Sequence, residues 1–499
     1  MPPNLVLSLC LVFCFVVLYR ESKLQKDVAW TLWLPTLWMM RCASRVLSAW
    51  LNPGVYDVSA VLAEDVEGSI HDQLFLGALL LLGWVVLWRR QDRLPEILTS
   101  NSFLFMFFGY MGISVFWSED MASFRRWIKA IGDLTMALIV VTEPKPFQAM
   151  LTIIRRTSYL LIPLSVILIK YFPEFGRFPS KNWKLDTWIG VSTHKNTLGQ
   201  LCLFAELVLL LDAVMVRFKH RQMLKLPLVK VPVDVLYGVM LVYLLYGDGY
   251  SKSTTSILVL FFACGIFLLL EHQRRRGRKI VPLRLVSGLL LTGLVAHIGM
   301  ELMLNSSLYV AVAESQGKDP TLTGRTELWM DLFKIGQRHP LLGAGYGGFW
   351  NPKMFWELKQ LHPWGPHQAH NGYIEIWLQL GFAGLLLFVP VVGHALQGVS
   401  LLLQKDFEYG RFRLILLLIT LLHNFTEAGF TRPTHLVWFV FLLVVINVKP
   451  VQTISAEVKQ VQAISAEKAP SLRRNMAMWE TKKVEFQTRT IDKQSAEYL

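Results

Sequence analysis

The chain has 499 residues, of which 53% are hydrophobic and only 17% are charged, and its formal net charge at pH 7 is +14. A soluble protein carries about 25% charged residues, whereas the apolar residues here form blocks of roughly 15 to 20, enough to cross a hydrocarbon core. These numbers exclude a soluble multidomain enzyme, a disordered protein and a disulfide scaffold. They predict an all-α polytopic membrane protein, in which excess Lys and Arg sets the topology and implies no nucleic-acid partner.

About 12 transmembrane helices are predicted from the apolar blocks. In chain order the blocks are 4–19, 28–41, 73–88, 101–117, 127–142, 157–172, 197–216, 232–246, 254–270, 285–304, 372–394, 412–423 and 434–448. The first block has no basic leader and no small-residue cleavage site, so we predict that it stays as a membrane helix. The five cysteines lie in or beside apolar blocks without metal-type spacing, and we predict that they are structural.

The Lys and Arg residues predict which loops lie in the cytoplasm. Among the short loops, one alternate set of five holds 20 of these residues and the other set of four holds 8, and basic loops stay cytoplasmic. The basic loops are 89–98, 143–156, 217–230, 271–284 and 393–413, and the outer loops are 118–126, 173–195, 247–252, 424–432 and the long loop 305–369. Residues 1–450 are thus predicted to form one transmembrane domain. Residues 451–499 are predicted to form a partly disordered cytoplasmic tail with a near-repeat, VQTISAE and VQAISAE.

The long outer loop 305–369 is rich in Gly, Pro and aromatic residues, which is typical of an ordered functional loop. Within it, residues 326–337 are predicted to form an amphipathic helix at the membrane interface. The apolar face of that helix comprises Trp329, Leu332, Phe333 and Gly336. The run GAGYGGFW at 343–350 is superficially similar to a dinucleotide-binding loop, but no strand precedes it, so we predict a tight backbone turn.

Polar residues at the outer ends of the predicted spans are the candidates for chemistry. A charge costs roughly 2.5–3.5 kcal/mol at the bilayer centre, and such residues therefore tend to face a cavity. The set comprises Arg125, Arg126, Lys129, Asp133, Arg177, His194, Lys195, Asn196, Arg325, His367, His370, Asn371, Glu375, His423, Asn424, Glu427 and Arg432. Because cations and histidines outnumber carboxylates in it, the set predicts an anionic, phosphate-bearing substrate.

Structural roles are the alternative for several of these residues. Snorkelling to lipid headgroups is the alternative for Arg125, Lys129 and Arg432. Pairing with a neighbouring helix is the alternative for Asp133, Glu206 and Asp212. A third alternative is an interfacial histidine satisfied by a carbonyl, at His423.

Two groups of residues were considered as metal ligands. Glu64, Asp65 and Glu67 could hold a divalent ion together with a lipid diphosphate, but a solvated acidic loop is the simpler interpretation. His362, His367 and His370 could ligate zinc, but their stretch is broken by proline and offers no helical i, i+4 pair. We therefore predict no metal site and no cofactor.

The segment HNGYIEIWLQLGFAG at 370–384 resembles the O-antigen ligase and Wzy-type polysaccharide polymerase superfamily. The ligase signature is His, then Asn, Ser or Gln, nine residues, Gly, two residues, and Gly, Thr or Tyr. His370, Asn371, Gly381 and Gly384 fill this signature without a gap. Three further segments are similar to that superfamily: GRTELW…HPLLGAGYGGFW (324–350), GVSTHKNTLGQLCL (190–203, like the exopolysaccharide-polymerase branch) and NFTEAGF (424–430).

The resemblance implies a metal-independent, GT-C-type glycosyltransferase of the bacterial inner membrane, with its active site facing the periplasm. Such an enzyme moves a glycan from undecaprenyl diphosphate to an acceptor hydroxyl with inversion. The resemblance also implies that Arg325 and His370 are catalytic and that Arg177 is a further essential arginine. We expect the substrate-binding residues to be Arg126, Arg177, His194, Lys195, Asn196, Asn371 and Glu427.

The chemistry of these residue types agrees with that reading. Without a metal, guanidinium groups would stabilise the leaving diphosphate, and a histidine would take the proton of the acceptor hydroxyl. We expect an O-antigen or exopolysaccharide polymerase. The alternatives are an O-antigen ligase that joins the glycan to lipid A-core, a lipid-linked glycan flippase or transporter, and a metal-dependent glycosyltransferase that uses Asp65 and Glu67. A transporter is expected to show internal repeats, and no such repeat is found.

Four kinds of partner follow from that reading. They are an undecaprenyl-diphosphate-linked oligosaccharide, an acceptor glycan or lipid A-core, membrane lipid, and a chain-length regulator or flippase.

Overall fold

The computed structural model describes residues 2–24, 29–51, 69–178, 187–219, 230–247, 253–277 and 325–448, which belong to one compact unit. Four predicted features lie outside the described residues: the acidic group 64–67, the span 285–304, the first part of the long loop, and the tail 451–499.

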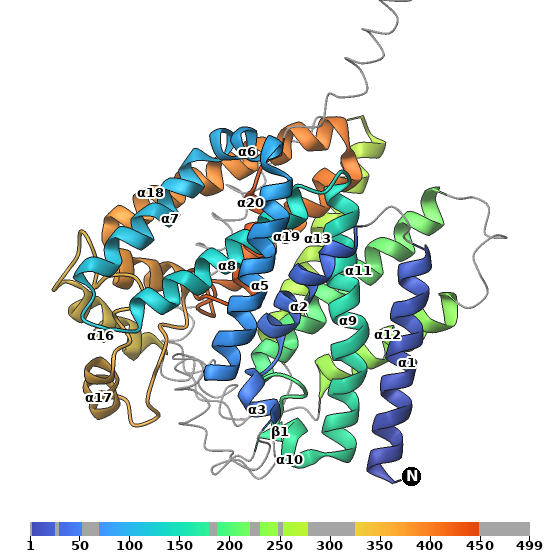
Figure 1. Ribbon diagram of the computed structural model, residues 1–499, viewed down its shortest axis with the longest axis horizontal. Coiled ribbons are helices and arrows are strands. Elements are labelled where there is room, and N and C mark those ends of the chain that lie inside the picture. Colours follow the sequence, from blue (N-terminus) through green and yellow to red (C-terminus); the bar gives the residue numbers. More distant parts are fainter. Residues whose placement is uncertain are drawn as a thin grey trace, which may run out of the picture. The chain divides into compact units, whose positions relative to one another are not determined.

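The described residues are mainly helical (Figure 1). The α-helices are α1 (Pro3–Leu24), α2 (Trp33–Ala43), α3 (Leu47–Leu51), α5 (Ile70–Arg89), α6 (Leu94–Ser100), α7 (Ser102–Ser114), α8 (Ser123–Val141), α9 (Pro146–Tyr171), α10 (Pro173–Gly176), α11 (Lys195–Lys219), α12 (Lys230–Tyr246), α13 (Thr254–Arg275), α16 (Arg325–Gly336), α17 (Pro352–Leu361), α18 (Gly372–Lys405), α19 (Phe407–His423) and α20 (Leu436–Val445). Short 3-10 turns are η1 (Trp30–Leu32), η2 (Gln91–Arg93) and η3 (Val115–Trp117). Strands β1 (Arg177–Phe178) and β2 (Thr187–Trp188) pair antiparallel, with Arg177 opposite Trp188.

Within the described ranges, five helices are long and apolar enough to cross a membrane: α1, α5, α9, α13 and α18. A sixth span results if the segments 91–100 and 102–117, which meet at a bend of 89°, count as one. The chain is therefore an all-α multi-pass membrane protein. Some of the other predicted spans are shorter helices. Helix α20, for example, has 10 residues and is about 15 Å long, which is half of a hydrocarbon core.

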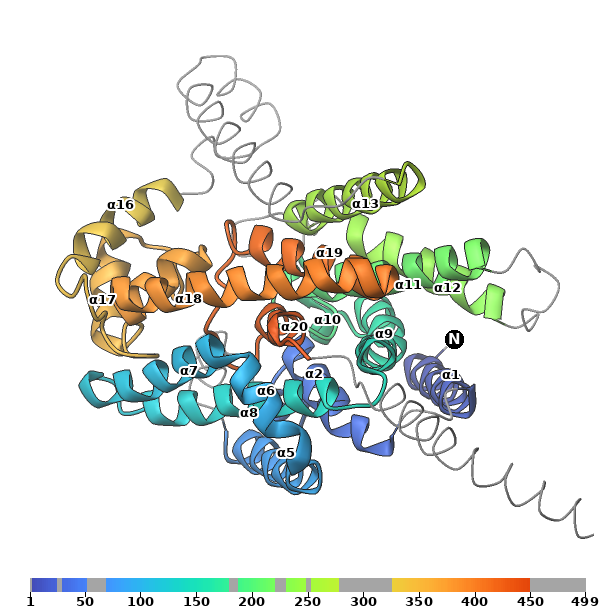
Figure 2. The same ribbon diagram turned by 90° about the horizontal axis from the view of Figure 1, so that it is seen from above.

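Helix α20 lies at the centre of the helix bundle (Figure 2). It contacts α2, α8, α18 and α19, and all of its residues are buried. The segment LVWFVFLLVV is apolar on every side, which is the composition expected of a helix surrounded by other helices.

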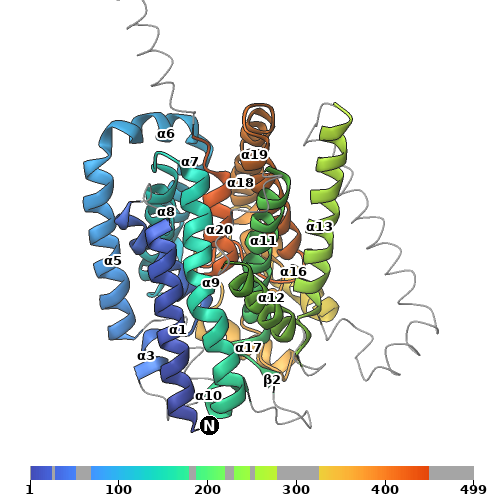
Figure 3. The ribbon, with the colours of Figure 1, turned by 90° about the vertical axis from the view of Figure 1, so that its right-hand side faces the viewer.

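Two ion pairs each join loops that the charge count placed in the same set. At the basic end, Arg411 pairs with Glu271 at 3.2 Å and so joins the two predicted cytoplasmic loops 271–284 and 393–413. At the other end, Arg325 pairs with Glu427 at 3.0 Å and joins two predicted outer loops. Figure 3 shows α6 at one end of the bundle and α10 and α17 toward the other. Which end faces the periplasm remains a prediction.

Helix α9 corrects one predicted boundary. It begins at Pro146, so most of the predicted loop 143–156 is helical. Arg156 in that stretch is buried, pairs with Glu21 at 3.0 Å, and lies over the Trp33 ring at 4.6 Å. Because the charge is compensated by another helix, the apolar pattern alone placed the start of the helix too late. Helices α18 and α19 extend beyond their predicted bounds in the same way and nearly close the loop 393–413.

The amphipathic helix of the long loop is present as α16, but its apolar face packs on protein. Leu328, Leu332 and Ile335 of α16 are buried in a small core with Leu358 of α17 and Leu378 of α18. Phe333, which was predicted on the apolar face, is 48% exposed. Helix α17 was not predicted. Side chains of α16 and α17 share this small core with Trp377 and Leu378 of α18.

A break inside α18 attaches the 343–347 turn to the helix bundle. Gly381 has a φ of +65°, and the N–H groups released by the break at Phe382 and Ala383 donate to the carbonyls of Pro340 and Leu341 at 2.9 and 3.0 Å. Gly343, Gly345 and Gly347 all have positive φ. The predicted tight backbone turn is therefore confirmed.

Candidate active site

The centre of the candidate site is the carboxylate of Glu427, in the turn between α19 and α20. Its Oε1 atom accepts hydrogen bonds from the side chains of Asn196 and Arg325, the latter at 3.0 Å, and its Oε2 atom lies 3.3 Å from His370 Nδ1. These partners stand at the starts of α11 and α16 and directly before α18. Four members of the set that the sequence nominated therefore meet at one buried point.

His370 is held at the beginning of α18 by the backbone around it. It adopts a left-handed conformation with a φ of +49°, which is uncommon for a non-glycine residue and is concentrated at functional sites. The next residue, Asn371, is the N-cap of α18, and its side-chain oxygen accepts the N–H groups of Tyr373 and Ile374 at 2.9 and 3.1 Å. The cap fixes where the helix begins and with it the position of His370.

Asn424 shapes the turn that carries Glu427. Its side-chain oxygen accepts the N–H groups of Gly429 and Phe430, both at 2.8 Å, and its carbonyl accepts the N–H of Gly372 at 2.7 Å. A Cβ atom at position 372 would lie 2.1 Å from that side-chain oxygen. Only glycine permits this close approach between α18 and the turn.

The electrostatic surroundings decide the protonation state of Glu427. Burial alone would raise its pKa, but the hydrogen bond from His370 and the positive charge of Arg325 oppose burial, and the pKa lies well below its usual range. An ionised carboxylate can only accept hydrogen bonds. His370 Nδ1 must therefore carry the hydrogen, and in the neutral ring Nε2 is then the nitrogen that can take a proton.

Arg325 is fixed in position but remains accessible. Its guanidinium donates to the carbonyl of Thr426 and to Glu427, and its side chain is 22% exposed. A guanidinium has more N–H donors than these two contacts use. The remaining donors suit a phosphate oxygen, which arginine binds in a forked geometry.

The segment from His194 to Asn196 forms the rim of the site. His194 is exposed, its Nδ1 atom accepts the Asn196 N–H at 3.2 Å, and its ring interacts electrostatically with Glu427 and His370. Lys195 begins α11 and adds a positive charge beside His194.

Arg126 belongs to a second cluster, in the wall behind the 343–347 turn. It is buried and donates to Asp120 at 2.7 Å and to the carbonyl of Gly347. Gln379 accepts the Gly347 N–H at 2.8 Å and donates to Glu375 at 2.7 Å. Among the described residues, these contacts tie Arg126 to the turn and not to Glu427.

Arg177 also lies apart from Glu427. It is the first residue of β1, and its Nε atom donates to the carbonyl of Ile169 at 3.0 Å. No contact among the described residues joins it to Glu427, Arg325 or His370. Its catalytic role stays a prediction.

The structural alternatives have mixed outcomes. Asp133 is paired, because it accepts Trp38 Nε1 at 2.7 Å and the Thr434 N–H at 3.0 Å. Arg432 donates to Gln368 at 2.9 Å, and Arg125 is exposed. The expectation that a carbonyl satisfies His423 is wrong: the ring is buried, and neither ring nitrogen has a hydrogen-bond partner among the described residues.

The histidines considered for zinc do not converge. His362 Nε2 lies 3.2 Å from Asp331, whereas His370 pairs with Glu427. In the part of the chain that the structure describes, no group of three or more His, Cys, Asp or Glu side chains could hold a metal ion.

The sequence did not single out the aromatic residues around the site. Trp350 donates to Glu375, and the Trp364 ring lies 5.9 Å from the His370 ring. Both tryptophans occupy irregular backbone, where no periodic pattern marks which side chains face inward.

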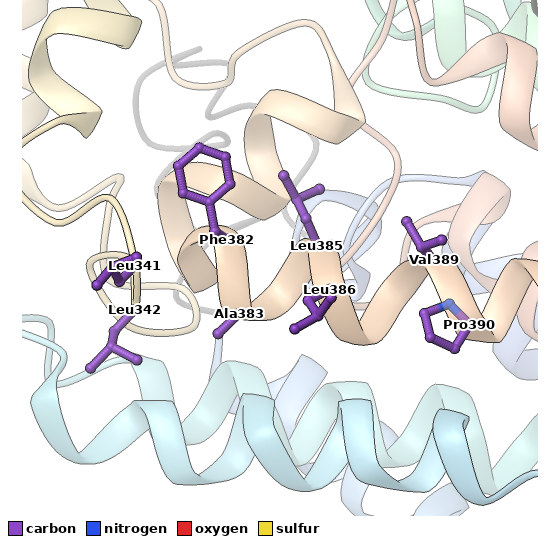
Figure 4. Close-up of a pocket in the computed structure, with 8 residues that line it drawn as sticks. All are labelled: Leu341, Leu342, Phe382, Ala383, Leu385, Leu386, Val389 and Pro390. Carbon is purple, nitrogen blue, oxygen red and sulfur yellow. The ribbon is translucent and has the colours of Figure 1, made fainter.

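An apolar pocket of about 650 Å³ opens beside the break in α18 (Figure 4). It is lined by Leu341, Leu342, Phe382, Ala383, Leu385, Leu386, Val389 and Pro390. Leu341 and Leu342 come from the segment that is hydrogen-bonded to the break, and the other lining residues come from the part of α18 that follows Gly381. The same helix therefore presents His370 and Asn371 at its beginning and an apolar surface further along.

Two comparisons with known proteins bear on this site. Residues 239–389 match the family model described as O-antigen ligase. The chain is 28% identical over 167 residues to the exopolysaccharide production protein ExoQ of Rhizobium meliloti (strain 1021), over 31% of this chain and 36% of the relative. The similarity thus spans about a third of the relative's length. Together the two comparisons confirm that the chain resembles the O-antigen ligase and Wzy-type polysaccharide polymerase superfamily.

Proposed function

We propose that the protein is a glycosyltransferase of surface polysaccharide assembly, and specifically a polymerase that moves a glycan from undecaprenyl diphosphate to the hydroxyl of an acceptor glycan. The proposal includes about 12 spans and a GT-C-type architecture. It also places the protein in the bacterial inner membrane with the Glu427 site facing the periplasm. The matched family and the name of the ExoQ relative support a role of this kind.

The observation that carries the proposal is the meeting of Arg325, His370 and Glu427. Glu427 holds the His370 ring with Nδ1–H toward itself, which directs Nε2 to accept a proton. Arg325 is bound to the same carboxylate and keeps N–H donors for an anion. A base and an anion-binding group are thus positioned by one residue.

The proposed reaction uses these groups as follows. The acceptor hydroxyl oxygen forms a bond to the anomeric carbon of the donor while the bond from that carbon to the diphosphate oxygen breaks. His370 Nε2 takes the hydroxyl proton. The guanidinium of Arg325 stabilises the negative charge on the departing lipid diphosphate. Attack opposite the leaving group inverts the anomeric carbon.

The apolar pocket on α18 supports a lipid-linked donor. A polyprenyl chain needs apolar surface close to the cations that hold its diphosphate, and the pocket lies on the helix that begins beside His370. Phe382, Leu386 and Val389 on this surface are each more than half exposed. They would contact the isoprene units of the carrier or the surrounding lipid.

The experiment that tests the proposal compares Arg325→Lys and His370→Ala with two control variants in the same loop. Arg325→Lys keeps the charge but loses the two parallel N–H donors of the guanidinium, so transfer should fall strongly. His370→Ala should slow transfer by roughly 10²–10⁴-fold. The controls are Arg338→Lys, whose exposed arginine pairs with Glu357, and His339→Ala, whose histidine is exposed. Both controls should transfer glycan normally.

Protein level in the membrane and thermal stability are measured beside transfer, because both site residues also adjoin helix starts. Normal transfer by a folded His370→Ala protein would remove the general-base role, and His194 would be the next candidate. Loss of folded protein in the site variants, with normal transfer per folded molecule, would show that the two residues are structural.

Ligation to lipid A-core is the second candidate, because the matched family model is described as O-antigen ligase. Ligase and polymerase differ only in the acceptor. The glycan profile of a deletion strain separates them: loss of long chains indicates a polymerase, and accumulation of unligated lipid-linked polymer indicates a ligase.

A further inference from the structure

Trp364 is the exposed aromatic residue next to the proposed base. Its side chain is 48% exposed, and its ring centroid lies 5.9 Å from that of His370, with the planes tilted by 48°. On its other side the His362 ring lies at 6.3 Å. A half-exposed aromatic ring thus lies beside the side chain of the proposed base.

The segment that carries Trp364 is fixed at both ends. At its start, the His362 N–H donates to the carbonyl of Leu358 at 2.7 Å, and the ring of His362 lies 3.2 Å from Asp331. Gly365 then turns the chain with a φ of +69°.

At the far end of the same segment, the carbonyl of Ala369 accepts Trp329 Nε1 at 2.8 Å, and the Ala369 N–H donates to Glu375 at 3.1 Å. With both ends anchored, little conformational entropy is lost when a ligand packs on the Trp364 ring.

Trp356 offers a contrast on the neighbouring helix α17. It is more exposed than Trp364, at 60%, but Lys359 lies over its ring at 4.7 Å. A basic and aromatic pair of this kind is typical of a membrane interface. Trp364, by contrast, is flanked by the rings of His362 and His370, and His370 pairs with the buried carboxylate of Glu427.

We propose that Trp364 is the platform on which the terminal pyranose of the acceptor glycan packs, with its hydroxyl directed at His370. The C–H face of a pyranose is apolar, whereas its edge carries hydroxyls, so an aromatic ring beside a proton acceptor matches both parts of the sugar. The inference rests on the proposed transferase function. It adds to that function a subsite and a ligand class, a sugar ring in pyranose form.

Steady-state transfer by the purified full-length protein tests this subsite, with Trp364→Ala, Trp364→Phe and the control Trp356→Ala. Trp364→Ala removes the surface on which the sugar packs, so it should raise the KM for the acceptor roughly tenfold, which corresponds to about 1.4 kcal/mol. The kcat should stay within about threefold of the original value, because the base and the arginine are untouched. Trp364→Phe should recover most of the lost affinity, and Trp356→Ala should leave the acceptor KM unchanged.

A binding measurement separates failure of the subsite from failure of the proposed function. The unlinked oligosaccharide repeat is titrated by saturation-transfer NMR into the His370→Ala protein and into the His370→Ala, Trp364→Ala double variant. Weaker binding to the double variant supports the subsite whether or not His370 is the base. Equal binding to the two proteins would overturn the subsite. An equal loss of transfer in Trp364→Ala and Trp356→Ala would also overturn it, and would indicate that both rings anchor the loop at the membrane.

Discussion

His367 and His370 stand in the same short loop, but their surroundings give them different properties. His370 faces the ionised Glu427, which favours the ring form whose Nδ1–H points at the Glu427 carboxylate. His367 is partly buried, and burial together with the charge of Arg432 lowers its pKa to about 4. At neutral pH His367 is therefore uncharged, which leaves Arg432 as the cation beside it.

The lowered pKa of His367 predicts how stability depends on pH. The unfolded chain, with an ordinary histidine pKa near 6.5, binds more protons than the folded chain between that value and about 4. Stability should therefore rise with pH across this window. His367→Gln removes this contribution, so the thermal midpoint of the variant in detergent should change less between pH 4.5 and 6.5 than that of the original protein. Identical pH dependence in the two proteins would show that His367 is not held neutral by the fold.

At the scale of elements, α18 gives a physical reason for the signature HN…G…G. His370 occupies the left-handed position before the helix, and Asn371 is the cap. Gly381 is the break at which α18 is hydrogen-bonded to the residues directly before the 343–347 turn. The interval between Asn and the first Gly of the signature is thus the length of helix between the cap at Asn371 and the break at Gly381. Chemistry at the cap and attachment of the outer loop at the break are set by the same segment.

Gly381→Ala should destabilise the protein strongly. A Cβ atom there would lie 2.2 Å from the carbonyl oxygen of Leu341, and the φ of +65° is unfavourable for alanine. We expect a loss of at least about 2 kcal/mol, seen as a lower thermal midpoint in detergent. The matched control is Gly393→Ala in the same helix, where a Cβ would meet nothing within 4 Å; its midpoint should be unchanged or slightly higher. Equal midpoints for the two variants would contradict the structural role of the break.

Single residues show what the sequence could predict about these elements. Apolar blocks located the long described helices, though not α17, and the HNG triplet located the start of α18, because both signals are local. The start of α9 was missed because Arg156 is compensated by Glu21, which is distant in sequence. The sequence placed Asn196, Arg325, His370 and Glu427 in one candidate set. It could not state that the first three contact Glu427, since no spacing within one chain states which distant loops touch. Trp364 carries no local signal.

At the scale of the whole molecule, the orientation predicted from the basic loops can be measured directly. In a protein without its native cysteines, Lys359→Cys on α17 and Lys405→Cys at the end of α18 place exposed thiols at opposite ends of α18. An impermeant thiol reagent applied to spheroplasts should label position 359 and not position 405, because the basic end stays in the cytoplasm. The reverse pattern would place the Glu427 site on the wrong side for a periplasmic acceptor.

The central claim is that this chain alone transfers a lipid-linked glycan at the Glu427 site. The most direct measurement is mass spectrometry of proteoliposomes that contain only the purified protein and an undecaprenyl-diphosphate-linked repeat, in excess chelator. We expect a carrier that bears a lengthened glycan and release of free undecaprenyl diphosphate, with product lowered roughly 10²–10⁴-fold in His370→Ala. Absence of both products, or products that form only when magnesium or manganese is restored, would contradict this claim.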